Sequence, residues 1–174
     1  MKRLFLLAAL FVIAVPTAFA APPGSEQSNS QQCKDQRQAM GMADFRALYA
    51  PNGSPKAAMD ACLARQTQAA STDAKNAAKA CKAERTSMGV EAFNAKYGTN
   101  PNKKNAFGKC VSSQAKELDD GHEEATLNAA KKCKAERVTL GVPAFNAKYG
   151  TNANKKNAFG KCVSKLATEQ GSSS

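Results

Sequence analysis

The sequence predicts an all-α protein made of three short, disulfide-stapled helical repeats that are joined by partly helical linkers. Three observations predict it. Residues 81–112 and 133–164 agree at 27 of 32 positions, and residues 33–64 form a third, more divergent copy. Each copy places two cysteines 29 residues apart. The apolar residues follow the spacing of a helix face, and no stretch alternates with the period of a strand.

The first twenty residues have the pattern of an export signal. Lys2 and Arg3 precede an apolar run over residues 4–15, and Ala20 ends a small-residue cleavage site. We expect cleavage near Ala20 and a secreted or periplasmic protein. The twelve apolar residues are fewer than the roughly 20 that a transmembrane helix needs. No later segment is apolar enough, so we expect no transmembrane anchor.

The repeats divide the chain into six predicted segments. They are a signal peptide (1–20), a disordered leader (21–32), helical repeat one (33–66), helical repeat two with the helix that leads into it (67–118), helical repeat three with its own leading helix (119–168), and a disordered tail (169–174). The leader is rich in proline, serine and glutamine and offers no apolar side chains to bury, which is typical of disorder.

Each copy is expected to contain three helices. Gly89 and Gly141 should end the first helix, and the second should begin near Val90 and Val142. Glycines 98 and 150 should end the second helix, because glycine tolerates the left-handed conformation that closes many helices. Ser54, Asn102 and Asn154 align and are good N-caps, so the third helices should start directly after them.

The segments between the copies, residues 63–80 and 111–132, are rich in alanine, lysine and glutamate and should be helical in large part. Asp119, Asp120 and Gly121 predict a turn that interrupts the second segment. In the first segment a residue among 71–73 should cap the helix that enters the second copy.

Six cysteines behind an export signal are typical of disulfides in an oxidising compartment. Because duplicated units usually contain their own disulfide, we expect one bond in each copy: Cys33–Cys62, Cys81–Cys110 and Cys133–Cys162. Sequence alone permits 15 pairings, so bonds between copies remain an alternative. A bond closing a loop of this length stabilises a unit by roughly 3.5 kcal/mol, which these small units need in order to fold.

The formal charge of +11 falls to +9 when Lys2 and Arg3 leave with the signal, and such a chain attracts polyanions. The predicted anion-binding residues are two lysine pairs at the expected start of the third helices: Lys103, Lys104, Lys155 and Lys156. An ordinary solvated lysine face is the alternative. The chain has no tryptophan and its aromatic residues have core spacing, which argues against a base-stacking surface for nucleic acid.

No catalytic residue, metal site or cofactor is predicted. The single histidine, His122, lies in a linker, and paired cysteines leave no thiol nucleophile. Glu84 and Glu136 have Gln36 as their counterpart in the first copy, which argues against a carboxylate-based hydrolase. The acidic residues 119–124 lack the ligand spacing of a calcium loop.

An arginine follows the first cysteine by four residues in every copy, as Arg37, Arg85 and Arg137. We expect each arginine stem to cover the core while its head bonds nearby carbonyls. We also expect the tyrosines 49, 97 and 149 to be core residues with a solvated hydroxyl. A ligand contact is the alternative for both sets.

The pattern CKAER, then GVEAFNAKYG or GVPAFNAKYG, then KNAFGKCVS resembles a cysteine-paired helical repeat of exported bacterial proteins of unassigned function. It covers residues 81–112 and 133–164 well and the first copy loosely. The resemblance implies no activity, substrate or cofactor. From the positive charge and the lysine pairs we expect a non-catalytic binding module for an anionic envelope or extracellular polymer. A structural spacer without a ligand and a secreted enzyme that uses carboxylates are the alternatives.

Overall fold

The computed structural model of the chain describes residues 26–171. Within these residues every regular element is an α-helix. In chain order the helices are α1 (Glu26–Met40), α2 (Met42–Tyr49), α3 (Pro55–Met88), α4 (Val90–Tyr97), α5 (Ala106–Leu140), α6 (Val142–Tyr149) and α7 (Ala158–Gly171). The prediction of an all-α protein is therefore confirmed.

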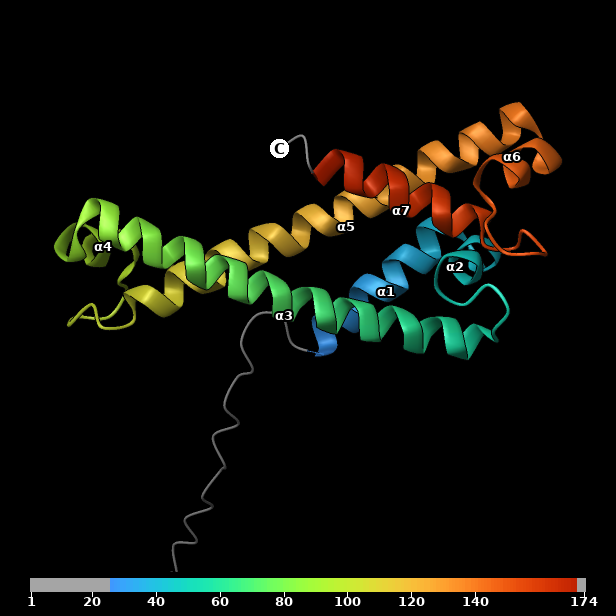
Figure 1. Cartoon of the computed structure of the whole chain (residues 1–174). Helices are drawn as coiled ribbons and strands as arrows, with labels where there is room; N and C mark the ends of the chain where they lie inside the picture. The colour runs from blue at the N-terminus through green and yellow to red at the C-terminus, as the bar shows by residue number, and fades with distance from the viewer. Residues whose placement is uncertain (1–25, 172–174) are drawn as a thin grey trace, which may run out of the picture.

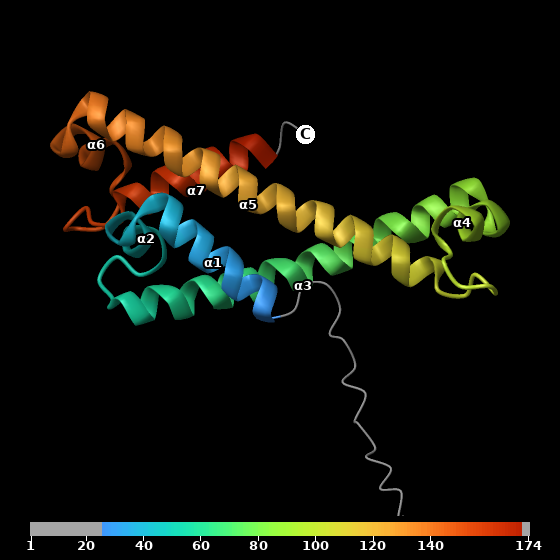
Figure 2. The ribbon, with the colours of Figure 1, turned by 180° about the vertical axis from the view of Figure 1, so that it is seen from behind.

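Two long helices, α3 and α5, organise the molecule. They run antiparallel and pack against each other, with α4 closing the turn between them at one end of an elongated structure (Figures 1 and 2). Helices α1, α2, α6 and α7 gather around the other end. We call the helices and loop around Cys33–Cys62 unit 1, those around Cys81–Cys110 unit 2, and those around Cys133–Cys162 unit 3. Unit 2 thus stands apart from the other two.

The segments between the copies are helical throughout. Helix α3 continues through residues 71–73 and α5 through residues 119–121, so the predicted cap and the predicted turn are both wrong. Alanine, lysine and glutamate favour helix, and Gly121 costs only about 1 kcal/mol within it. Tertiary contacts outweigh that cost: Asp73 is buried, and Asp119 accepts a hydrogen bond from Gln32 at 2.6 Å.

The predicted leader and tail both contribute helix. Helix α1 begins at Glu26, so the expectation of disorder is wrong for residues 26–32. The reason is polar packing: the amide of Asn29 donates to the hydroxyl of Thr67 at 3.4 Å, and Gln32 is buried. Helix α7 continues to Gly171, which also corrects the predicted tail. The signal peptide, residues 21–25 and residues 172–174 lie outside the described residues.

The three disulfides are present, one in each copy, with the predicted partners: Cys33–Cys62, Cys81–Cys110 and Cys133–Cys162. All six half-cystines are fully buried, and beside each bond lies a phenylalanine with no exposed surface, Phe45, Phe93 or Phe145. Each phenylalanine packs on a tyrosine one helical turn later, with ring centres 4.9 to 5.0 Å apart. The disulfides indicate an oxidising compartment.

Glycines end the helices at the predicted positions, for two different reasons. Gly89 and Gly141 have φ angles of 86° and 75°, which glycine adopts without strain, and the next helix begins directly after each. Gly98 has a φ of −72° and is not left-handed, contrary to the prediction, and the same holds for Gly150. Space is limiting there: a Cβ on Gly98 would lie 2.6 Å from the carbonyl oxygen of Asn94.

The third helix of each copy begins at the predicted place only in unit 1, where the Ser54 hydroxyl accepts from the backbone of Ala57 at 3.1 Å. In units 2 and 3 it begins at Ala106 and Ala158, three residues later than the N-cap alignment predicts. Unit 1 has a proline directly after its cap, which cannot take a positive φ, whereas the aligned lysines of the other units do.

Each unit has a buried cluster of its own, and the largest, that of unit 3, also includes a residue of unit 1. Met40 from unit 1 is buried in the cluster around Phe145, Phe159 and Val163 of unit 3. The cluster of unit 2 has four buried members: Cys81, Phe93, Ala106 and Cys110. Across residues 26–171 none of the helices has both the length and the apolar character that a membrane crossing requires.

Candidate functional site

The predicted lysine pairs lie in the loops before the third helices of units 2 and 3. Lys103 and Lys155 are left-handed, with φ angles of 56° and 55°. Each ammonium donates to a loop carbonyl, Lys103 to Gly98 at 2.8 Å and Lys155 to Gly150 at 2.9 Å. These two lysines therefore close their own loops. The side chains of Lys104 and Lys156 are exposed.

The two lysine loops do not form one surface. The loop of unit 2 lies at one end of the α3–α5 pair, and the loop of unit 3 lies at the other end (Figure 1). Their placement corrects the expectation that all four lysines stand in the first turn of a helix. Whether they bind an anion stays a prediction, with Lys104 and Lys156 as the members whose ammonium groups are not bonded to a loop carbonyl within the described residues.

Positive charge is concentrated on unit 2. Residues 75–111 contain eight lysines and arginines and only two acidic residues, whereas the remainder of 26–171 contains 15 and 12. Lys75, Lys79 and Lys82 stand at helical spacing on α3 and are exposed. None of the three has an ion pair to an acidic side chain within the described part of the chain. We call the residues 75–111 the basic end.

The middle of α5 carries the opposite charge. Five of the eight residues from 117 to 124 are acidic. Burial raises the pKa of Glu123 above 4.5, and the nearby carboxylates of Asp35, Asp119 and Asp120 raise it further. The residues 26–171 contain no group of three or more potential ligands placed to hold a metal ion. The long helix pair is therefore negative at its centre and positive at the end that carries unit 2.

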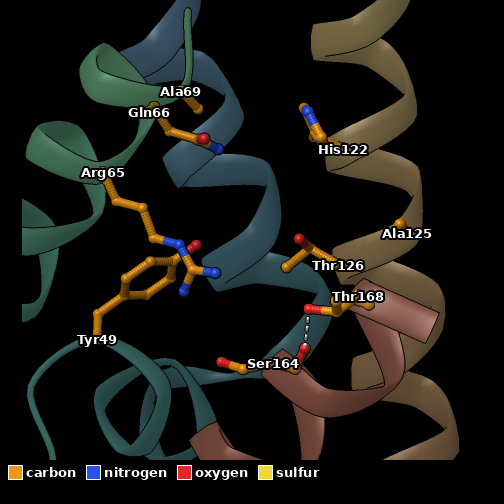
Figure 3. Close-up of a pocket in the computed structure, with 10 residues that line it drawn as sticks. Tyr49, Arg65, Gln66, Ala69, His122, Ala125, Thr126, Ser164 and Thr168 are labelled. Atoms are coloured by element: carbon orange, nitrogen blue, oxygen red, sulfur yellow. Dashed lines mark hydrogen bonds between the residues drawn. The ribbon is translucent and has the colours of Figure 1, made fainter. Parts of the chain in front are cut away.

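A cleft of about 470 Å³ opens between α3, α5, α7 and the end of α2. Tyr49 and Arg65 line one side, and His122 and Thr126 lie across from them (Figure 3). Burial raises the pKa of Tyr49 from 10.0 to about 12, so its hydroxyl stays protonated at neutral pH. His122 lies 3.3 Å from the buried carboxylate of Asp73.

The cleft lacks the arrangement that nucleophilic catalysis needs. Such chemistry requires a hydroxyl or thiol within hydrogen-bond reach of its base. Among the described residues, the one side chain that interacts with His122 is Asp73, and no cysteine is free. The hydroxyl of Thr168 donates to the backbone of Ser164 at the far end of the cleft (Figure 3).

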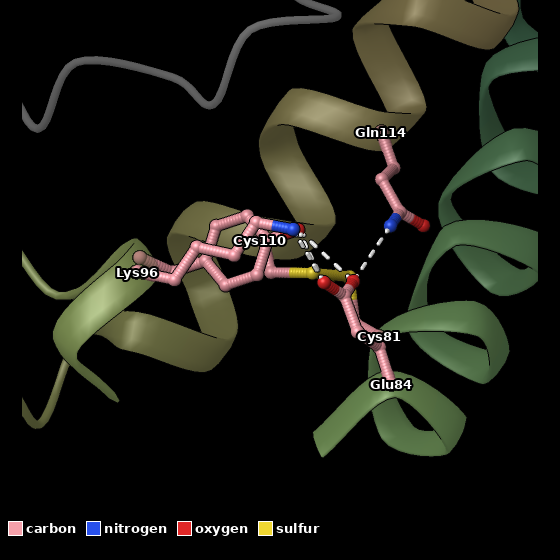
Figure 4. Close-up of a disulfide and its surroundings, with 6 residues drawn as sticks. Cys81, Glu84, Lys96, Cys110 and Gln114 are labelled. Atoms are coloured by element: carbon pink, nitrogen blue, oxygen red, sulfur yellow. Dashed lines mark hydrogen bonds and ion pairs between the residues drawn. A yellow bond between two sulfur atoms is a disulfide. The ribbon is translucent and has the colours of Figure 1, made fainter. Parts of the chain in front are cut away.

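The repeated glutamates have a structural role beside the disulfides. Glu84 accepts hydrogen bonds from Lys96 at 2.7 Å and from the hydroxyl of Tyr97 at 2.9 Å, next to the Cys81–Cys110 bond (Figure 4). The bonds from Lys96 and Tyr97 lower the pKa of Glu84. Unit 3 repeats the arrangement with Glu136, and in unit 1 Gln36 accepts from Tyr49. The tyrosine hydroxyls are thus bonded to side chains, and Glu84 and Glu136 tie the second helix to the first.

The three arginines differ in their surroundings, a difference that we did not predict from the sequence. Arg85 and Arg137 lie over the rings of Phe107 and Phe159, at 5.4 and 5.1 Å from the ring centres. The head of Arg137 donates to both carboxylate oxygens of Asp44 at 2.6 and 2.9 Å, so the prediction that it bonds carbonyls is wrong. A signal was present: Asp44 is an acid where the other copies have alanine.

The chain matches no known family model, no curated protein and no solved structure. The function is therefore inferred from the surfaces described above.

Proposed function

We propose that this protein is an exported, non-catalytic binding module for an anionic polymer of the envelope or the extracellular space, and that the basic end is its binding surface. The observation that carries the proposal is the excess of positive charge on residues 75–111, eight basic residues against two acidic ones. Clustered charge of one sign raises the local concentration of an oppositely charged ligand and speeds its association.

The arrangement of the basic end supports a polymer rather than a small anion. The three lysines of α3, at 75, 79 and 82, extend over two helical turns, and Lys104 lies beyond them in the loop of unit 2. A polymer can contact such spaced charges together, and each contact adds to the total affinity. Lysine is a point charge without the bidentate geometry of arginine, which favours attraction along a chain over recognition of one group.

The length of the helix pair favours a second candidate, a structural spacer. At 1.5 Å per residue the 34 residues of α3 extend roughly 50 Å, and they hold unit 2 away from the other units. A spacer needs no ligand, so retention on a polyanion separates the two candidates.

The test is binding of the full oxidised chain to dextran sulfate as a function of salt. The variant K75Q/K79Q/K82Q removes three charges from the basic end. Its matched control, K131Q/K132Q/K161Q, removes three exposed lysines from the opposite half. At about 1 kcal/mol for each lysine near an anionic surface, the first variant should bind at least tenfold more weakly and have a shallower salt dependence.

The control should change much less. Equal losses in both variants would show attraction by net charge without a defined surface, and no binding by the unaltered chain would leave the spacer. The variant K104Q/K156Q tests the lysine pairs and leaves Lys103 and Lys155 to close their loops. Unaltered binding by this variant would remove the pairs from the surface.

A further inference from the structure

Unit 3 and unit 2 carry nearly the same surface, but only that of unit 3 is covered. In unit 3 it consists of Lys134, Arg137, Phe159, Gly160 and Val163, and the equivalent residues of unit 2 are Lys82, Arg85, Phe107, Gly108 and Val111. We call this set the docking face. All five residues are identical in type in the two units.

Helix α2 of unit 1 lies on the docking face of unit 3. Its Asp44 forms the two hydrogen bonds with Arg137, and the ammonium of Lys134 donates to the carbonyl of Met40 at 2.8 Å, at the end of α1. Ala47 and Leu48 pack against the core of unit 3. The contact is close, because a Cβ on Gly160 would lie 2.8 Å from the carbonyl oxygen of Ala47.

The docking face of unit 2 is open. Phe107 and Val111 are half-buried, whereas their counterparts Phe159 and Val163 are 3 % and 1 % exposed. A Cβ on Gly108 would meet nothing within 4 Å. Arg85 has no ion pair within residues 26–171, and the views in Figures 1 and 2 show no further helix against this end beside α4. The arginine nevertheless lies over its phenylalanine as Arg137 does.

We infer that the docking face of unit 2 binds a short helix of a partner protein that has the pattern of α2: an acid, a small residue three positions later and an apolar residue four positions later. Two observations support this occupant. The near-identical face of unit 3 already holds such a helix, and the charges of Lys82 and Arg85 are unpaired in unit 2 and complement an acid.

A second copy of this chain does not supply the helix. Helices α4 and α6 have alanine where α2 has Asp44, and lysine where α2 has Leu48. The remaining candidate, α2 itself, is seated on unit 3 of its own chain. Each chain therefore has two docking faces and one helix that fits them, and the exchange of α2 between chains leaves as many faces open as before.

The test uses the full isotope-labelled chain and a synthetic peptide with the sequence of residues 40–50. A lactam bridge between positions 42 and 46 stabilises the helix, and at 100° per residue it lies opposite the face with positions 44, 47 and 48. Saturable amide shifts are expected at Gly108 and Val111. The equivalent residues of unit 3, Gly160 and Val163, should not shift, because their own α2 covers them.

Two variants of the chain and one of the peptide make the test specific. The variant R85Q should bind about tenfold more weakly, as the loss of a charged hydrogen-bond partner predicts. The variant G108L should not bind, since its side chain fills the place of the helix backbone, while the open surroundings of Gly108 allow it to fold. A peptide with residues 43 and 44 exchanged keeps its charge and should also bind at least tenfold more weakly.

Absence of saturable shifts, or equal binding of the exchanged peptide, would overturn the inference. Shifts at Gly160, or self-association of the chain that G108L abolishes, would show exchange of α2 and refute the choice of partner. Two variants distinguish this inference from the polymer proposal. G108L should keep its binding to dextran sulfate. A further variant that leaves Lys82 of the docking face in place, K75Q/K79Q/K104Q, should keep its binding to the peptide.

Discussion

The glycines of the two docking faces provide a matched test of the packing between units 1 and 3. Gly108 and Gly160 are both the third residue of a helix and sit in the same local sequence, NAFGKC. Neither has a positive φ, so alanine fits the backbone at either position. They differ in what surrounds them. We therefore expect G108A to stabilise the protein and G160A to destabilise it.

The magnitudes follow from the distances. A Cβ at position 160 would lie 2.8 Å from the carbonyl oxygen of Ala47 and 3.2 Å from the Cα of Leu48, both backbone atoms that move only with α2. Overpacking of this kind costs about 1–3 kcal/mol. Replacement of a helical glycine by alanine contributes about 0.5–1 kcal/mol in return, and at position 108 that gain has no opposing contact. At roughly 2–4 °C per kcal/mol, G160A should lower the Tm by several degrees and G108A should raise it slightly.

The assay is thermal and guanidinium unfolding of the oxidised chain, followed by far-ultraviolet circular dichroism. Unchanged m-values would show that the two variants expose the same surface on unfolding. The measured quantity is the difference between the two Tm shifts, since the substitutions are chemically identical. Equal stabilisation by both alanines would refute the packing of α2 on unit 3.

Three further predictions follow from contacts in the structure. The variant R137Q should lower the free energy of unfolding by about 2 kcal/mol, because it leaves the buried carboxylate of Asp44 without its bidentate partner. The variant R85Q should change it by less than about 0.5 kcal/mol. Guanidinium unfolding measures both changes. The variant C81S/C110S should lower the free energy of unfolding by roughly 3.5 kcal/mol. Amide hydrogen exchange should show a loss of protection in unit 2 while units 1 and 3 stay protected, since their buried clusters are separate from that of unit 2. The pKa of Glu123 is raised in the folded state, so ionisation of this side chain opposes folding at neutral pH. The variant E123Q should therefore raise the free energy of unfolding at pH 7 by about a few tenths of a kcal/mol after solvent screening. This gain should vanish as the pH falls below the unfolded pKa near 4.5. A gain that persists at pH 3 would rule out this cause.

Local patterns were sufficient to predict the features that depend on neighbouring residues. The helical spacing of the apolar residues predicted the fold class, and Gly89 and Gly141 end helices because a φ near 80° is accessible to glycine at little cost. The equal spacing of the cysteines predicted bonds within each copy, and the structure contains those pairs. Each of these features lies within one copy of the repeat.

Features that depend on packing between copies were not predicted. Asp119, Asp120 and Gly121 have the composition of a turn, but α5 continues through them because α1 and α3 pack against α5 and Gln32 of α1 donates a hydrogen bond to Asp119. The pairing of Asp44 with Arg137 joins residues 93 positions apart, and no local pattern specifies it. The sequence of a repeat therefore does not show which of its copies is covered.

The loop before the third helix was mispredicted for a different reason. Aligning Ser54 with Asn102 and Asn154 assumed that all copies begin this helix alike. In units 2 and 3 the lysine after the asparagine takes a left-handed conformation, and its ammonium bonds the carbonyl of the glycine that ends the preceding helix. The lysine pairs therefore lie in a loop and not at a helix terminus, where they were predicted.

The central difference between the repeats is that α2 covers the docking face of unit 3, whereas the same face of unit 2 is open. Solvent paramagnetic relaxation enhancement at the amides of Gly108 and Gly160 measures it most directly, because both amides lie in the first turn of a helix with identical neighbours. We expect strong relaxation at Gly108 and weak relaxation at Gly160. Equal relaxation at the two glycines would contradict this expectation.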